Sequence, residues 1–295
     1  MQSCILYLLK YVSICLLSVC LPAHALTVVQ KMPTLSLTAE ADYMVGEQSK
    51  PAVLILHGFL TTNQFHTIRS IADFLHSEGF STLAPTLTLN ISQRRSLLKC
   101  NSLHTHTMDR DSIEIEYWVQ WLHAQGHDKV VLIGHSSGSL SILEYLETHS
   151  NPAVSGAIST SLFYLNGPEL GIIDEEVESA RMLLKNRINK PSTYHFLFCN
   201  NQYYATPQSF LSYLKMDRAY TLKALKGLKI PSYTIMGGAD KRFKKVGREW
   251  LNALKSTQTN LIVIEGANHF FSNEYEFDVQ DTLLQILTSP PLEEP

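Results

Sequence analysis

The chain has 295 residues, with 24 Lys and Arg against 27 Asp and Glu, a formal net charge of −3 at pH 7 and 45% hydrophobic residues. This length and hydrophobic content suit one large domain with a sizeable core, and no internal repeat or low-complexity stretch divides the chain. The near-neutral charge, with no basic block and no basic residues interleaved with aromatic ones, argues against nucleic acid as a partner.

The first 25 residues have the pattern of a secretory signal peptide. Lys10 precedes an apolar run at residues 11–21, and the triplet Ala-His-Ala at residues 23–25 matches a small-x-small cleavage site. We therefore expect an exported protein, periplasmic or secreted, whose signal peptide at residues 1–25 is removed.

Residues 26–295 would then form a single domain with no stable membrane span. The alternative is a membrane anchor through uncleaved residues 4–21, although spanning a bilayer needs about 20 apolar residues.

Strand-like and helix-like segments alternate along the rest of the chain, as a mostly parallel sheet with helical crossovers requires. Gly79 and Gly126 mark the ends of two of the helices. In chain order we expect a strand at 52–56, a helix at about 63–77, a strand at 81–85, a helix at 109–125, a strand at 129–133, a helix from about 139 to 146, strands at 154–159, 230–236 and 261–264, and a helix at 270–287.

The strongest chemical signal lies directly behind the apolar strand at 129–133. There the chain reads Gly134-His135-Ser136-Ser137-Gly138, a G-x-S-x-G motif that leads into a helix. A serine raised on a sharp strand-to-helix turn needs small residues two places before and after it, and the two glycines occupy those places. Ser136 is therefore the candidate nucleophile, against the alternative of a chance motif in a loop.

Candidate partners for this serine follow two later strands. A serine hydroxyl is a weak nucleophile that needs a histidine base, which a carboxylate orients. Asp240 comes just past the strand at 230–236, and His269 lies on the loop after the strand at 261–264. We assign Asp240 as the acid and His269 as the base, against the alternatives of an ordinary turn aspartate and a solvated loop histidine.

On these residues the chain resembles the α/β-hydrolase family, whose triad runs in the order Ser, acid, His, with each member after a strand of one sheet. The resemblance implies an α/β-hydrolase fold, with a mostly parallel central sheet flanked by helices. By position, the backbone N–H groups of Phe59, after the strand at 52–56, and of Ser137 would form the oxyanion hole.

The resemblance implies a serine hydrolase that cleaves carboxylic esters through an acyl-enzyme intermediate, with a small-molecule substrate and no cofactor. A thioesterase, peptidase or acyltransferase would use the same triad, and a non-catalytic hydrolase-fold binding protein is the alternative outside enzymes.

A long segment separates the strand near residue 158 from the strand near residue 232. In proteins of this family such an insertion forms a cap over the serine, so we expect a cap at about residues 162–228. Its stretch at 194–204 is rich in aromatic residues. These residues either form a pocket for an apolar or aromatic acyl group or pin the cap to the sheet.

Two cysteines, Cys100 and Cys199, would remain after removal of the signal peptide. An exported protein meets an oxidising compartment, so we predict a disulfide between them, with two buried free thiols as the alternative.

His104 and His106, together with Asp109 and Asp111, suggest metal ligands. They lack helix-fixed i,i+4 spacing and the triad needs no metal, so no metal is expected.

Overall fold

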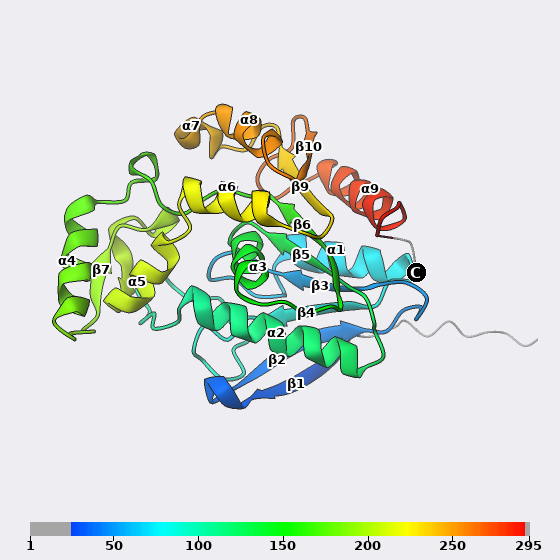
Figure 1. Ribbon diagram of the computed structural model, residues 1–295, viewed down its shortest axis with the longest axis horizontal. Coiled ribbons are helices and arrows are strands. Elements are labelled where there is room, and N and C mark those ends of the chain that lie inside the picture. Colours follow the sequence, from blue (N-terminus) through cyan, green and yellow to red (C-terminus); the bar gives the residue numbers. More distant parts are fainter. Residues whose placement is uncertain (1–24, 293–295) are drawn as a thin grey trace, which may run out of the picture.

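The computed structural model describes residues 25–292, so the expected signal peptide lies outside the described residues but for Ala25. An eight-stranded sheet forms its centre (Figure 1), in the order β1-β2-β4-β3-β5-β6-β9-β10. Strand β2 is antiparallel to its two neighbours and the other pairings are parallel. The strands are β1 (Leu26–Met32), β2 (Leu37–Met44), β3 (Ala52–Leu56), β4 (Thr82–Thr86), β5 (Val130–His135), β6 (Val154–Thr160), β9 (Ser232–Gly237) and β10 (Asn260–Ile264). The expected mostly parallel sheet is confirmed.

Helices cover both faces of the sheet. Alternate residues of the central strands enter different cores: Val53 and Val131 pack toward α1 (His66–Ser77) and α9 (Tyr275–Leu287), whereas Leu54 and Leu132 pack toward α2 (Met108–Ala124) and α3 (Ser137–Thr148). Strands buried on both faces explain why these segments read as continuous apolar runs.

Two helices begin later than the sequence suggested. Helix α1 begins at His66, because buried Asn63 donates its side-chain amide to the Ala84 carbonyl and accepts from Thr86 Oγ1 in a loop. Helix α9 begins at Tyr275, because Phe271 and Asn273 have positive φ, which interrupts a helix.

The α4, β7 and α5 part of the predicted cap, residues 162–228, extends from one end of the molecule, at the left of Figure 1, whereas its last helix, α6, packs over α3. Its elements are η2 (Pro168–Leu170), α4 (Asp174–Lys185), β7 (Ser192–Tyr194), η3 (Leu197–Gln202), β8 (Tyr203–Ala205), α5 (Pro207–Leu214) and α6 (Arg218–Gly227). Three short elements lie outside it: η1 (Pro33–Leu35) between β1 and β2, and α7 (Phe243–Val246) and α8 (Glu249–Lys255) between β9 and β10.

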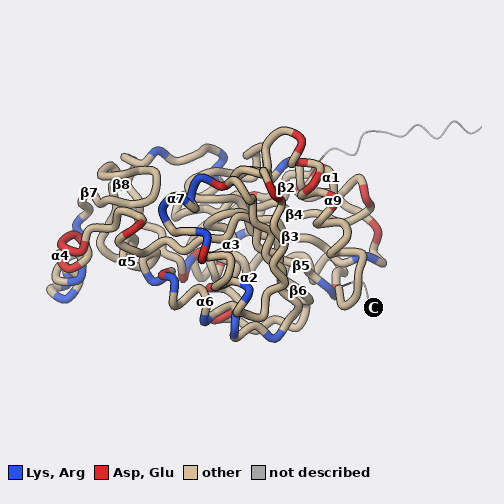
Figure 2. The backbone as a smooth tube through the Cα atoms, turned by 90° about the horizontal axis from the view of Figure 1, so that it is seen from above, with Lys and Arg blue, Asp and Glu red and all other residues tan. Residues whose placement is uncertain are grey.

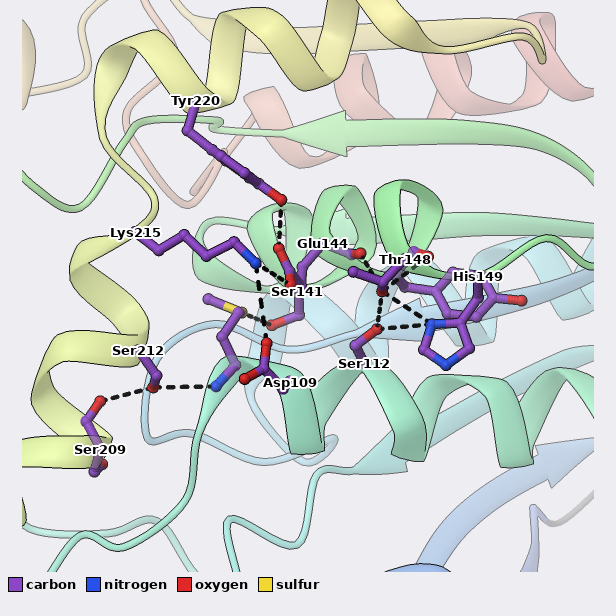
Figure 3. Close-up of polar contacts among 12 residues, drawn as sticks. Asp109, Ser112, Ser141, Glu144, Thr148, His149, Ser209, Ser212, Lys215 and Tyr220 are labelled. Carbon is purple, nitrogen blue, oxygen red and sulfur yellow. Dashed lines mark hydrogen bonds and ion pairs between the residues drawn. The ribbon is translucent and has the colours of Figure 1, made fainter. Parts of the chain in front are cut away.

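Two links fasten the cap to the rest of the molecule. Cys100 and Cys199 form a disulfide with a Cα–Cα distance of 5.4 Å, which joins the long β4–α2 connection to η3. On helix α3, fully buried Glu144 accepts hydrogen bonds from Lys215 and, at 2.6 Å, from Tyr220 of the cap (Figure 3). The cap is thus held to the helix that follows Ser136.

Among residues 25–292, no helix is long and apolar enough to cross a bilayer.

Candidate active site

Ser136 occupies a sharp turn between β5 and α3. Its φ of 56° and ψ of −121° are unusual for a residue with a side chain. A Cβ added to Gly134 would lie 2.5 Å from the Ser139 nitrogen, and one added to Gly138 would lie 2.6 Å from the His57 carbonyl oxygen. Glycine is therefore required at both flanking positions, as the motif indicated.

Ser136, His269 and Asp240 form one hydrogen-bonded chain. His269 Nε2 lies 3.0 Å from Ser136 Oγ, and its Nδ1 lies 2.6 Å from Asp240 Oδ2. All three are buried, with exposed fractions of 6% for Ser136, 8% for His269 and 3% for Asp240. The structure thus brings together the three residues that the sequence singled out on separate strands.

The loops that carry the acid and the base support one another. Gly238 donates its backbone N–H to the Ile264 carbonyl, and Ala239 donates to Ala267. The second carboxylate oxygen of Asp240 accepts the Arg242 backbone N–H at 2.9 Å. One carboxylate oxygen of Asp240 is therefore held by a backbone N–H, and the other forms the hydrogen bond to the His269 imidazole.

The environment of His269 favours its neutral form. Burial lowers the pKa of His269, and the hydrogen bond to Asp240 opposes that shift. With Asp240 accepting the Nδ1–H, the unprotonated Nε2 faces Ser136 Oγ. This imidazole is suited to accept the serine proton at neutral pH.

The loop after β3 lies against the serine. A Cβ added to Gly58 would lie 3.5 Å from Ser136 Cβ, and the next residue is Phe59. The backbone N–H groups of Phe59 and Ser137 donate no hydrogen bond to any residue between 25 and 292, although both residues are buried. Backbone N–H groups that lack a hydrogen-bond partner and lie beside Ser136 are suited to bind a negatively charged oxygen.

His57 fixes this loop from within the core. Burial, and after it the charge of Arg94, lowers the pKa of His57 to about 3, so its imidazole is neutral. Its Nδ1–H donates to the Gly58 carbonyl at 2.8 Å. Its Nε2 accepts from the Leu87 N–H at 3.0 Å and from Arg94 Nη2 at 3.2 Å.

Arg94 is a buried residue that the sequence gave no reason to single out. Its guanidinium donates to the carbonyls of Leu87 at 2.7 Å, Ser96 at 2.8 Å and Thr61 at 2.8 Å, besides His57. Burial lowers the pKa of Arg94 to about 10, which leaves it cationic at neutral pH. We call residues 57–61, which carry the proposed oxyanion donor Phe59, the oxyanion loop. Arg94 therefore ties both ends of the oxyanion loop to the β4–α2 connection.

Two carboxylates of α2 lie in the same buried region. Burial raises the pKa of Asp111 to about 8 and that of Glu114 to about 7. Asp111 accepts the hydroxyl of Tyr213 from the cap, and Glu114 accepts from the Thr88 hydroxyl at 2.7 Å. Acidic residues on a helix usually indicate a solvated face, so the sequence did not reveal Glu114, and it offered Asp111 only as a possible metal ligand.

The residues considered as metal ligands have other partners. His106 Nδ1 lies 2.6 Å from the Tyr213 hydroxyl, whereas Asp109 lies 3.9 Å from Lys215 Nζ. Among residues 25–292, no group of three or more His, Cys, Asp or Glu side chains is arranged to hold a metal ion.

The aromatic stretch of the cap packs against the loop after β3 and also lines a cavity, and its role as an acyl pocket stays a prediction. The buried rings of Phe196 and Tyr203 pack on Phe59, at centroid distances of 5.3 and 5.7 Å, and pin the cap to the oxyanion loop. Phe198 also contacts Phe59, at 5.8 Å, but is 61% exposed and lines a cavity of about 410 Å³.

Comparison with known proteins agrees with this architecture. The solved structures that resemble it include Est1E from Butyrivibrio proteoclasticus, at 14% identity and a TM-score of 0.60, covering 89% of this chain and 99% of that chain. The alpha/beta hydrolase GrgF from Penicillium sp. sh18 has 14% identity, a TM-score of 0.66 and coverage of 89% and 97%. A bromoperoxidase from Bacillus anthracis has 16% identity, a TM-score of 0.58 and coverage of 89% and 100%.

Identities this low establish a common fold and leave the reaction open. A search of the curated proteins finds no match to this chain. The sequence profile of the alpha/beta hydrolase family, by contrast, matches residues 53–279, which include the whole hydrogen-bonded chain from Ser136 to Asp240. The protein belongs to the alpha/beta hydrolase family.

Proposed function

We propose that the protein is an exported serine hydrolase that cleaves carboxylic esters, with Ser136 as nucleophile, His269 as base and Asp240 as the acid that orients it. The observation that carries this proposal is the continuous hydrogen-bonded chain from Ser136 Oγ through the imidazole to Asp240. We place the signal peptide at residues 1–25 and one domain at residues 26–295, with residues 162–228 as its cap.

In the first half-reaction, Ser136 Oγ attacks the ester carbonyl carbon while His269 Nε2 takes the hydroxyl proton. The carbonyl oxygen becomes negatively charged and accepts hydrogen bonds from the N–H groups of Phe59 and Ser137. Collapse of the tetrahedral intermediate breaks the bond to the alcohol, which leaves with the proton from His269. The acyl group stays on Ser136.

In the second half-reaction, water gives a proton to His269 and attacks the acyl-enzyme carbonyl. The released acid carries the acyl group, and Ser136 recovers its proton. Asp240 stays ionised throughout and stabilises the imidazolium that forms twice in each cycle. Neither half-reaction requires a metal or an organic cofactor.

Several features favour an ester with an apolar or aromatic acyl group. Aromatic rings of the cap pack on Phe59 and beside His269, and Phe198 is open to solvent at the cavity. The disulfide between Cys100 and Cys199 agrees with export to an oxidising compartment. The low-identity structural neighbours support the fold of this proposal and do not select among its substrates.

The test is hydrolysis of a 4-nitrophenyl ester series from acetate to palmitate by the mature protein. Ser136→Ala serves as the blank, because it removes the nucleophile but keeps the Cβ. We expect release of 4-nitrophenol that the blank lacks, with the preferred chain length reporting the size of the acyl pocket. Equal turnover by Ser136→Ala would remove the assignment of the nucleophile.

A fluorophosphonate probe tests the same site without assuming a substrate. Covalent labelling requires a serine activated by its base, so the wild-type protein should be labelled and both Ser136→Ala and His269→Ala should not. An unlabelled wild-type protein would favour a hydrolase-fold binding protein.

A further inference from the structure

The cavity that Phe198 lines lies beside the candidate active site. Phe163 forms another part of its wall, and the centroid of the Phe163 ring lies 6.2 Å from that of the His269 imidazole. Phe198 contacts Phe59, whose N–H is one of the proposed oxyanion donors. The cavity wall is therefore linked to His269, the proposed base, by the Phe163 ring and to the oxyanion loop by the Phe198 ring. The cavity, of about 410 Å³, is thus adjacent to His269 and Phe59, although Ser136 is not itself among its lining residues.

One part of the cavity wall is apolar. Leu170 and Leu197 of the cap complete it together with Phe163 and Phe198. Burial of apolar surface favours binding of hydrocarbon by about 25 cal/mol per Å². This part suits an aliphatic or aromatic arm of the substrate.

The remaining part carries positive charge. Lys241, Arg242 and Lys245, from the segment that contains α7, line the cavity, and none of its described lining residues is acidic. Figure 2 shows this basic stretch in blue around α7. Lysine and arginine on a cavity wall attract anions, and a wall of low polarity strengthens that attraction.

The two lysines have no counter-ion within the described part of the chain, whereas the Asp240 carboxylate lies close enough to Arg242 to attract it. The side chains of Lys241 and Lys245 are exposed and form no hydrogen bond or ion pair with any residue from 25 to 292. The Arg242 guanidinium lies 5.7 Å from the centre of the Phe163 ring and likewise forms no hydrogen bond there. Burial lowers the pKa of Arg242 and the charge of Asp240 opposes that shift; a bound anion would oppose it further.

The cap wall of the cavity is held in a fixed and strained shape. Leu197 has a φ of 51° and Asn200 a φ of 49°, values that side-chain-bearing residues rarely adopt. Between them Cys199 is bonded to Cys100, and the Phe196 N–H donates to the Asn200 carbonyl at 2.9 Å. Strain of this kind is kept where the surrounding structure enforces it, and it concentrates at binding sites.

We propose that this cavity is a subsite for the anionic end of the substrate, so that the natural ester carries a negatively charged group, such as a carboxylate, on an apolar arm. The apolar wall would hold the arm, and Lys241, Arg242 and Lys245 would bind the charge. This inference rests on the proposed serine esterase activity and adds a substrate class to it.

The test compares matched esters that differ only in charge. Mono-4-nitrophenyl esters of dicarboxylic acids from succinate to sebacate are paired with neutral esters in which an isopropyl group replaces the terminal carboxylate. At one chain length we expect kcat/KM of the anionic ester to exceed that of its neutral partner. The ratio should fall toward one in 1 M NaCl, because screening shortens the reach of charge interactions to about 3 Å.

The matched variants are Lys241→Gln/Lys245→Gln and, as control, Lys223→Gln/Lys255→Gln. Both double variants remove two exposed lysines, but the control pair does not line the cavity. A cation at contact distance in water strengthens anion binding about fivefold, so the first variant should lower the anionic-to-neutral ratio by about 25-fold. The control should keep the wild-type ratio.

The outcomes separate the two proposals. Ser136-dependent hydrolysis with equal rates for anionic and neutral esters, or with a ratio that Lys241→Gln/Lys245→Gln leaves unchanged, would overturn the anionic subsite and keep the esterase. If no ester is hydrolysed, the esterase proposal falls, and calorimetric titration of octanoate against neutral octanamide into Ser136→Ala decides the subsite alone. Octanoate must bind more tightly than octanamide, and failure to do so overturns it.

Discussion

Replacing Arg94 by methionine should weaken both the fold and catalysis, because its guanidinium links the oxyanion loop to the chain behind it. Methionine fills similar apolar space but donates nothing to the carbonyls of Leu87, Ser96 and Thr61 or to His57 Nε2. At about 1 kcal/mol for each of the four hydrogen bonds removed, the loss is about 4 kcal/mol. That is a large share of the roughly 5–15 kcal/mol by which domains are stable.

The catalytic effect follows from the position of the loop. Removing one oxyanion donor costs about 10²- to 10³-fold in kcat, so displacing the Phe59 N–H should cost about 10- to 100-fold, with little change in KM. Urea unfolding and kinetics on 4-nitrophenyl acetate measure the two effects. The control is Arg69→Met, which removes an exposed i,i+4 pair with Asp73 and an exposed hydrogen bond to the Gln64 side chain, and should change stability by less than about 0.5 kcal/mol.

Two results would refute this reasoning. An Arg94→Met protein as stable as the wild type would show that the four hydrogen bonds do not support the loop. A destabilised protein with unchanged kcat would show that Arg94 holds the fold without placing the oxyanion donors.

Three further predictions concern charge, orientation and cross-linking. Because the pKa of Asp111 is about 8 in the folded protein against 3.8 for a free aspartate, the folded state binds more protons between these values, and the free energy of unfolding should fall as pH rises through that window. Asp111→Asn should flatten the dependence in urea titrations at pH 5 and 8, and an unchanged slope would contradict the assignment. Asp240→Asn should lower kcat about 10⁴-fold, because an amide can fix His269 in the wrong tautomer, and a loss below tenfold would argue against Asp240 as the acid. Replacing Cys100 and Cys199 by alanine should lower the free energy of unfolding by up to about 4.7 kcal/mol in the chain-entropy model, since the disulfide spans 99 residues. Two alkylatable thiols in the unreduced mature protein would show that the disulfide is absent.

The sequence was most informative where chemistry and local structure impose the same pattern. Ser136 and His269 follow strands that contain continuous apolar runs, Asp240 follows a strand of mixed composition, and parallel strands bring such positions to one edge of a sheet. The glycines at 134 and 138 have a steric cause in the backbone atoms that a Cβ would meet. Local patterns therefore sufficed for the candidate triad and for most of the sheet.

The sequence was least informative where long-range contacts decide the structure. No strand was assigned to residues 26–51, yet β1 and β2 form one edge of the sheet, and the exposed residues of β1 give it no apolar run. Arg94 and Glu114 look like ordinary surface charges, and Asp111 suggested only a metal ligand; the folded arrangement alone supplies their buried partners. No spacing rule links residues that meet only through tertiary packing.

At residue 136 the backbone conformation favours glycine, whereas the proposed reaction needs a serine side chain. The φ of 56° and ψ of −121° suit glycine, which has no Cβ, whereas a side-chain-bearing residue there costs about 1–3 kcal/mol. Selection for a more stable fold alone would favour glycine at residue 136 and would abolish the nucleophile. The persistence of serine there, in a turn that resists it, means that the rest of the domain must be stable enough to hold its reactive group in an unfavourable conformation.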